Sequence, residues 1–115
     1  MRNLTIRQGS RTLSQQILWA KNAYRRLVGL LNHQQLAENE GLLLDPCNQV
    51  HSLFMRFPID VVFLDQDNNI LRIQQLHPWR VSPIVWKAKR VLELPLGQTQ
   101  AWNLNAGMRL EVSHD

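Results

Sequence analysis

Two apolar runs separated by a short polar segment place the strongest constraint on what this chain can fold into. Residues 59–64 (IDVVFL) alternate, so that Ile59, Val61 and Phe63 share one face of an extended strand, and residues 70–76 (ILRIQQL) form a second apolar run. The DQDNN segment between them consists of residue types that tolerate turn conformations. The pattern therefore predicts a β-hairpin with a polar loop.

Further short strands are predicted on both sides of this hairpin. They are expected at residues 2–7, 13–19, 41–46, 50–55, 90–94 and 108–112. The best helix candidate runs from Asn22, a plausible N-cap, to Leu31, and residues 77–86 read as a loop because two prolines interrupt them. We therefore expect an α+β fold with a mainly antiparallel sheet of short strands, which could be barrel-like, and one principal helix.

Length and composition indicate one ordinary globular domain. The 115 residues suffice for a single hydrophobic core, so we expect one domain over residues 1–115. Of these residues 44% are apolar and 19% are charged, as in ordinary globular proteins. No stretch approaches the ~20 apolar residues that span a bilayer. The amino-terminal residues lack the apolar region of a signal peptide, and a lone Cys47 cannot form an internal disulfide, so we expect a cytoplasmic protein.

The formal net charge of +4 is unevenly distributed. All six charged residues before Glu38 are basic, and a second basic cluster comprises Arg80, Lys87, Lys89 and Arg90. A solvated basic face explains this pattern better than nucleic-acid binding, because no nucleic-acid-binding module accompanies it. Nucleic-acid binding through the amino-terminal region stays open as a lesser alternative.

Several ordered blocks of the chain resemble domain-of-unknown-function family 192, an uncharacterised family of short, bacterial-type proteins. The resemblance covers about residues 20–112, and His51–Asp65 is its most specific stretch. The blocks are Arg26–Leu31 (RLVGLL), Glu40–Leu44 (EGLLL), His51–Asp65 (HSLFMRFPIDVVFLD), Val91–Gly97 (VLELPLG) and Ala106–Leu110 (AGMRL). The resemblance implies a compact, strand-rich α+β fold, and it implies no established activity or catalytic residues.

The chain departs from the family pattern at one segment and at two single residues. Many relatives carry Trp-Met-Lys-Asn-Thr where this chain has residues 51–55, so no role of that Asn-Thr pair can be transferred. Leu96 replaces the usual alanine, which alters packing slightly. Met108 occupies a place where aspartate is common, so a polar role is lost there.

Three polar residues, His51, Asp60 and Glu93, interrupt apolar strand runs within these blocks. A carboxylate in such a place must face solvent, pair with an arginine or line a cavity. For each residue alone, a structural ion pair with Arg56, Arg80 or Arg90 is the preferred interpretation over a ligand site. Cys47 could be imagined as a nucleophile with His51 as its base, but no cysteine-hydrolase signature surrounds it, so an inert thiol is favoured.

The predicted loop at 77–86 carries the best functional signal. Trp79 and Trp86 flank it and Arg80 lies within it. Aromatic side chains beside arginine can anchor a partner, or they can cover the open end of a small sheet, and the two readings are equally supported.

The leading hypothesis is a non-catalytic binding or accessory module for a protein or small-molecule partner. Its site would lie where His51, Asp60, Arg80 and Glu93 approach the loop between Trp79 and Trp86. The alternative is a small hydrolase that uses His51 with a carboxylate. We expect no cofactor and no metal: Asp65-x-Asp67-x-Asn69 lacks the later glycine and glutamate of a calcium loop.

Overall fold

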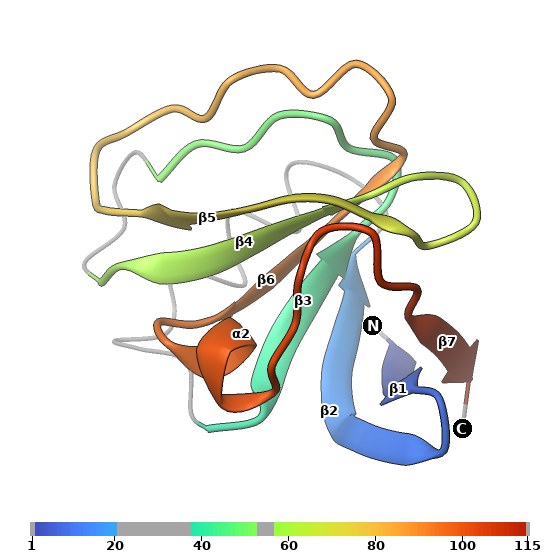
Figure 1. Ribbon diagram of the computed structural model, residues 1–115. Helices are drawn as coiled ribbons and strands as arrows, with labels where there is room; N and C mark the ends of the chain where they lie inside the picture. Colours follow the sequence, from blue (N-terminus) through green and yellow to red (C-terminus); the bar gives the residue numbers. More distant parts are fainter. Residues whose placement is uncertain (1, 21–37, 53–56, 115) are drawn as a thin grey trace.

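The computed structural model describes residues 2–20, 38–52 and 57–114, and these form a curved, seven-stranded sheet with one short helix (Figure 1). The predicted helix at Asn22–Leu31 lies outside the described residues. The elements are β1 (Arg2–Gln8), β2 (Arg11–Ala20), β3 (Glu40–Leu44), β4 (Ile59–Leu64), β5 (Ile70–Leu76), β6 (Arg90–Pro95), α2 (Gln98–Ala101) and β7 (Glu111–His114).

The order of strands across the sheet is β5-β4-β6-β3-β2-β1-β7. Every neighbouring pair is antiparallel except β2 and β3, which run parallel with Ile17 opposite Gly41. The prediction of a mainly antiparallel, strand-rich fold is therefore confirmed, and the sheet is open rather than a closed barrel. The backbone of residues 107–110 nonetheless hydrogen-bonds to residues 68–70, which shields the beginning of β5 at one edge.

The predicted hairpin is confirmed as β4 and β5, with Ile59 opposite Leu76. The strands predicted near residues 2–7, 13–19, 41–46 and 90–94 are also present. Around residue 50 the chain is irregular: His51 forms a single β-bridge with Val81, and residues 53–56 lie outside the described part. The last strand is shifted to Glu111–His114 because residues 107–110 pair with the β5 edge instead.

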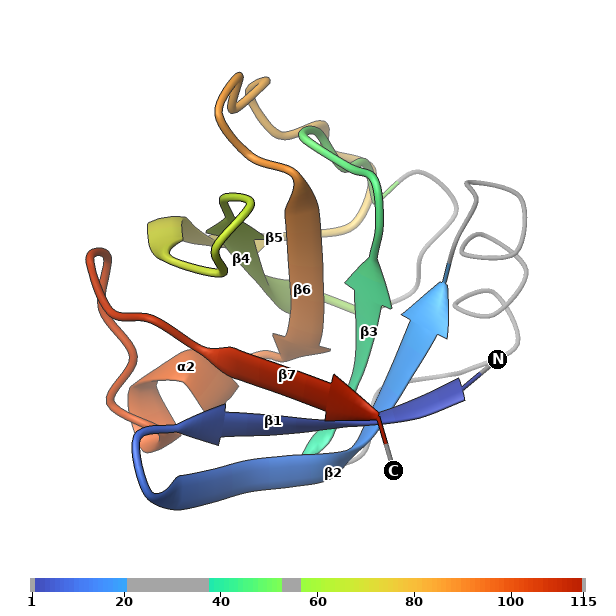
Figure 2. The same ribbon diagram turned by 90° about the vertical axis from the view of Figure 1, so that its right-hand side faces the viewer.

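Two apolar clusters cover the two faces of the sheet. One contains Leu4 and Ile6 from β1 together with Val62, Leu64 and Ile70 from β4 and β5. Since strands far apart in the sheet order meet in this cluster, we call this side the concave face (Figure 2). The other cluster, on the convex face, packs the second set of β4 residues against the chain segments around Val50 and Ala88.

Within the described residues, no helix is both long and apolar enough to cross a membrane. Gly41 lies in β3, next to β6 and to Ile17 of β2. A Cβ atom at this position would lie 2.6 Å from the backbone oxygen of Glu93 and 2.9 Å from Leu94 Cδ2. Position 41, at the centre of the sheet, therefore has no room for a side chain larger than that of glycine.

The predicted polar turn between β4 and β5 is held by the Asp65 carboxylate. Its Oδ1 accepts hydrogen bonds from the backbone N–H groups of Asp67 and Asn69, both at 2.9 Å, and its Oδ2 accepts from Asn69 Nδ2. Backbone donation from Asn69 is the largest cause that lowers the pKa of Asp65 below its ordinary value of 3.8. This turn therefore favours the charged carboxylate.

We expect Asp65→Asn to remove a pH-dependent share of stability. The pKa of Asp65 is lower in the folded chain than in the unfolded chain, so the unfolded chain binds the proton first as pH falls. The stabilisation is therefore fully present above the pKa of the unfolded chain, and it is lost as pH falls through the pKa of the folded chain. Thermal unfolding of wild type and variant between neutral and acidic pH should show a difference in Tm that shrinks below pH 3.8. Asp67→Asn removes an equal charge from the same turn as a control, and pH profiles of wild type and Asp65→Asn that run parallel would contradict the assignment.

Candidate functional site

The connection between β5 and β6, residues 77–89, forms an ordered surface loop that we call the 77–89 loop. Its backbone pairs with residues 48–52: Ser52 N donates to Arg80 O at 2.8 Å, Trp79 N to Ser52 O at 2.9 Å, and Ser82 N to Val50 O at 2.8 Å. The two segments lie side by side above β5 in Figure 1. The loop therefore has a defined conformation although it contains no regular strand.

Two buried serines fasten this pairing. Ser52 is fully buried, and its Oγ donates to His77 O and accepts from the backbone N–H of Arg80 at 2.8 Å. Ser82 Oγ accepts from the backbone N–H of Val50 at 3.0 Å. Buried hydroxyls that bond the backbone at both ends of a loop restrict its motion, which lowers the entropy lost when a partner binds.

The loop holds Trp79 in an unusual backbone conformation. Its φ of 65° lies in the left-handed region, which costs an aromatic residue about 1–3 kcal/mol. The hydrogen bond from its N–H to Ser52 O keeps it there. Such strain is maintained by the surrounding structure and concentrates at binding sites.

The outer side of the 77–89 loop exposes large apolar side chains. Trp86 is 80% exposed, Trp79 59%, Val81 57% and Ile84 41%. Most of the exposed large apolar side chains in the described part of the chain thus lie within this one loop, the other being Leu96. Clustered apolar exposure of this kind marks interaction surfaces, whereas isolated exposed side chains do not.

The same loop is basic. Arg80, Lys87 and Lys89 are all exposed, and the sequence from His77 to Leu92 contains no aspartate or glutamate. The exposed apolar side chains therefore share the loop with three exposed basic side chains, and the loop itself contains no acidic side chain to neutralise them. A partner that brings negative charge would gain both affinity and association rate.

His51 lies beside this loop, and the two predicted carboxylates lie elsewhere. His51 is exposed, and its β-bridge with Val81 places it next to Arg80. Asp60 and Glu93 face opposite sides of the sheet, because Asp60 is opposite Leu94 on the concave face and Glu93 is opposite Val61 on the convex face. Of the six predicted site residues, Trp79, Arg80 and Trp86 thus lie in the 77–89 loop and His51 is bridged to it, whereas Asp60 and Glu93 lie in the sheet.

The carboxylate of Asp60 binds α2. It is 1% exposed, and its Oδ2 accepts hydrogen bonds from Thr99 N at 3.0 Å and from Thr99 Oγ1 at 2.6 Å. Its Oδ1 accepts none from the residues that the structure describes. The hydrolase alternative needs the carboxylate of Asp60 or Glu93 within hydrogen-bond distance of His51. Asp60 Oδ2 instead accepts its hydrogen bonds from Thr99.

Cys47 and the potential metal ligands are the other reactive groups of the described residues. Cys47 is a half-buried free thiol whose Sγ donates to Gln49 O at 3.1 Å. Across residues 2–20, 38–52 and 57–114, no group of three or more His, Cys, Asp or Glu side chains could hold a metal ion. What the 77–89 loop offers chemically is an apolar, positively charged contact surface.

Val81, Ile84 and the two serines were missed as parts of this site. Val81 and Ile84 looked like ordinary apolar residues, and only their exposure distinguishes them. The serines could have been noticed, since each has apolar neighbours, at Val50-His51-Ser52-Leu53 and Val81-Ser82-Pro83-Ile84. Their role depends on a pairing between segments about thirty residues apart, which their local sequence does not reveal.

Comparison with known proteins gives uncharacterised relatives. A UPF0127 protein of Pyrococcus furiosus is 40% identical over 62 residues, which are 54% of this chain and 53% of that protein. A UPF0127 protein of Pyrococcus abyssi is 34% identical over 62 residues, with the same coverage of both chains. The match thus spans about half the length of these curated relatives.

Two solved structures share the fold. A protein of unknown function from Novosphingobium aromaticivorans superposes with a TM-score of 0.76 at 18% identity, covering 95% of this chain and 83% of that one. A putative transcription regulator from Sinorhizobium meliloti superposes with a TM-score of 0.75 at 22% identity, covering 96% and 92%. At these identities the similarity establishes the fold alone.

The family comparison confirms the resemblance found in the sequence and extends it toward the amino terminus. The match to DUF192, described as Uncharacterized ACR, runs over residues 4–112 and so includes β1 and β2. The chain therefore belongs to the DUF192 family, whose function is unknown.

Proposed function

We propose that the protein is a non-catalytic binding module whose 77–89 loop docks an acidic, apolar segment of a partner protein. The observation that carries this proposal is the joint exposure of Trp79 and Trp86 on a loop that hydrogen bonds hold in one conformation. Tryptophan and arginine are the residue types that most often dominate the binding energy of protein interfaces. A rigid loop presents them at low entropic cost.

Charge and shape support a peptide partner over a nucleic acid. Val81 and Ile84 are exposed between the two tryptophans, and aliphatic side chains suit apolar side chains of a partner better than they suit stacked bases. Arg80 precedes them in the loop and Lys87 and Lys89 follow them, all three exposed, so acidic residues flanking the apolar contacts would be favoured. His51 lies at the border of this surface through its bridge with Val81.

The finer assignments of fold and setting belong to the same proposal. We infer an α+β domain over residues 1–115 in which a principal helix at residues 22–31 accompanies the sheet. We also infer a cytoplasmic setting, which the free thiol of Cys47 supports because reducing compartments keep thiols unpaired.

The test is selection from a library of random linear peptides displayed on phage. We expect the enriched peptides to combine acidic with aromatic or aliphatic residues, and to bind less tightly as salt concentration rises. Trp79→Ala and Trp86→Ala should each weaken binding by about tenfold or more, and Arg80→Ala should mainly slow association. Binding can be followed by the fluorescence of the exposed tryptophans, which should shift to shorter wavelength on burial.

Two matched variants serve as controls for this experiment. Leu96→Ala removes another exposed apolar side chain, and Arg7→Ala removes an exposed arginine from β1, so both should bind the selected peptides like wild type. Selected peptides without acidic residues, or wild-type affinity of both Trp79→Ala and Trp86→Ala for the selected peptides, would overturn the proposal. Tight, salt-sensitive binding of a DNA duplex that Arg7→Ala weakens would instead favour nucleic-acid binding through the amino-terminal region.

A further inference from the structure

A cavity of about 220 Å³ lies at the rim of the concave face, apart from the 77–89 loop. It is formed where the end of β2, the end of β3 and the beginning of β6 meet β1, β7 and the β4–β5 turn. The opposite ends of β2 and β3 are covered instead: Arg11 Nη2 donates to Trp102 O at 2.6 Å, and Asn39 N donates to Gln98 Oε1 at 3.0 Å. The cavity is therefore the open end of the concave face.

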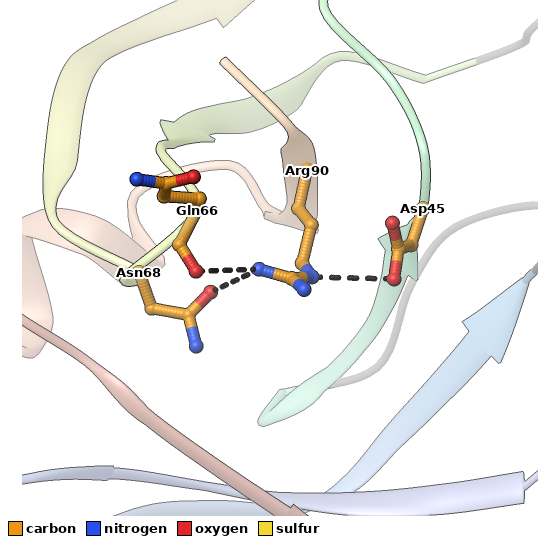
Figure 3. A network of polar contacts seen from close by, with 4 residues as sticks. All are labelled: Asp45, Gln66, Asn68 and Arg90. Atoms are coloured by element: carbon orange, nitrogen blue, oxygen red, sulfur yellow. Dashed lines mark hydrogen bonds and ion pairs between the residues drawn. The ribbon is translucent and has the colours of Figure 1, made fainter. Parts of the chain in front are cut away.

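One wall of the cavity is an arginine whose orientation is fixed by its neighbours. Arg90 Nε pairs with Asp45 Oδ2 at 3.2 Å, and Nη1 donates to Asn68 Oδ1 at 3.1 Å and to Gln66 O at 3.3 Å (Figure 3). The remaining nitrogen, Nη2, donates to no acceptor in the part of the chain that the structure describes. A positioned guanidinium thus retains one N–H₂ group for a ligand.

The rest of the lining combines apolar side chains with the polar side chains of Asp45, Asn68 and His114. Leu4 and Leu43 are 1% and 2% exposed and line the cavity together with Val112. The rings of Trp19 and His114 lie 5.3 Å apart at an angle of 52° and complete the lining. Sites for small molecules likewise combine apolar side chains with fixed polar groups that orient the ligand.

We propose that this cavity binds a small monocarboxylic acid with a flat, apolar body. The carboxylate accepts hydrogen bonds from Arg90 Nη2, and the body packs between Leu4, Leu43 and the Trp19 ring. The volume is below the ~300 Å³ at which sites for drug-sized ligands begin, so the body is a single ring or a short branched chain.

The charges around Arg90 select a monoanion over a dianion. The carboxylate of Asp45 already neutralises much of the guanidinium charge at 3.2 Å. Among the described residues that line the cavity there is no lysine and no second arginine, so a phosphate dianion would meet stronger repulsion from Asp45 than a monoanion would. A carboxylate needs only the single N–H₂ group that Arg90 leaves available.

The test uses benzoate as probe with the full chain labelled with ¹⁵N. We expect saturable shifts of the Trp19 indole N–H and the Arg90 Nε–H signals in NMR spectra. Benzamide, which has the same ring without the charge, should bind at least about tenfold more weakly, and inorganic phosphate should leave both signals unchanged. Equal binding of benzamide, or phosphate binding at the same signals, would overturn the choice of a monocarboxylate.

Two variants on neighbouring residues of β7 test the location. Val112→Phe fills the cavity without altering the Arg90 contacts and should abolish benzoate binding, whereas Ser113→Phe places the same ring on the opposite, exposed side of β7 and should not. Arg90→Lys keeps the charge and removes the planar donor group, so it should weaken benzoate at least about tenfold. Wild-type affinity in both Val112→Phe and Arg90→Lys would overturn the site.

The loop variants separate this proposal from the proposed function. Trp79→Ala and Trp86→Ala should bind benzoate with wild-type affinity, because both residues lie outside the cavity lining. Loss of benzoate binding in those variants would contradict an independent site. Failure of the peptide selection leaves the outcome at the cavity unaffected.

Discussion

Replacing Gly41 with alanine is expected to cost about 3 kcal/mol or more of folding free energy, because the added methyl group has no space at the centre of the sheet. The Cβ would lie 2.6 Å from a backbone oxygen of β6, and backbone in a paired strand cannot move aside as a side chain can. Leu94 Cδ2 at 2.9 Å and Ile17 Cδ1 at 3.0 Å crowd it from both neighbouring strands. Denaturant unfolding measures the loss.

Gly9→Ala is the matched control for this substitution. A Cβ at Gly9 meets nothing within 4 Å, but the φ of +63° makes alanine unfavourable there, so we expect a loss of only about 1 kcal/mol. The comparison separates backbone strain from steric exclusion. Equal losses for the two variants would show that contact with Glu93 O does not determine the requirement for glycine at position 41.

Replacing Asp60 with alanine is the second change with a large expected effect, a loss of about 3 kcal/mol. The substitution leaves the N–H and the hydroxyl of Thr99 without their acceptor, and Thr99 is only 5% exposed. Groups desolvated in this way cost more than the bond itself contributed. We expect α2 to lose its attachment to β4, with faster amide hydrogen exchange in residues 98–102 before global unfolding.

Thr99 provides the matched pair for this prediction. Thr99→Val keeps the shape and removes the hydroxyl, so it should cost about 1–2 kcal/mol, whereas Thr99→Ser keeps the donor and should cost less. Asp67→Ala removes an exposed aspartate of the β4–β5 turn and controls for charge. If Asp60→Ala were as stable as Asp67→Ala, the carboxylate would have no structural role, and a ligand would become the better reason for its burial.

Local sequence patterns predicted most strands, because the alternation of apolar residues along a strand can be recognised without knowing the strand's neighbours. The hairpin of β4 and β5 is the clearest case, since the alternation of both runs and the residue types of the turn agree. The parallel pairing of β2 with β3 and the position of β6 between β4 and β3 could not be predicted, because they depend on contacts between distant segments. The outline of the fold was therefore accessible from the sequence, and the order of its strands was not.

The same distinction applies to the candidate site. Trp79, Trp86 and Arg80 were predicted because aromatic side chains beside arginine on a loop can anchor a partner, and the structure places all three in one exposed loop. Asp60 and Glu93 seemed to belong together as carboxylates in apolar strands, but Asp60 is opposite Leu94 and not Glu93, which turns the two side chains to different faces. A shift of one residue in the pairing of β4 with β6 determines which face each carboxylate occupies, and the local sequence does not reveal that register.

The place of β6 in the sheet has a consequence for how the protein is made. While the ribosome adds the chain from its amino terminus, β1, β2 and β3 can form one partial sheet and β4 with β5 another, yet neither pairs directly with the other. Only β6 joins β3 to β4, and only β7 then covers β1. Nascent chains that end before residue 90 therefore present unpaired strand edges, at which chaperones or other nascent chains can bind.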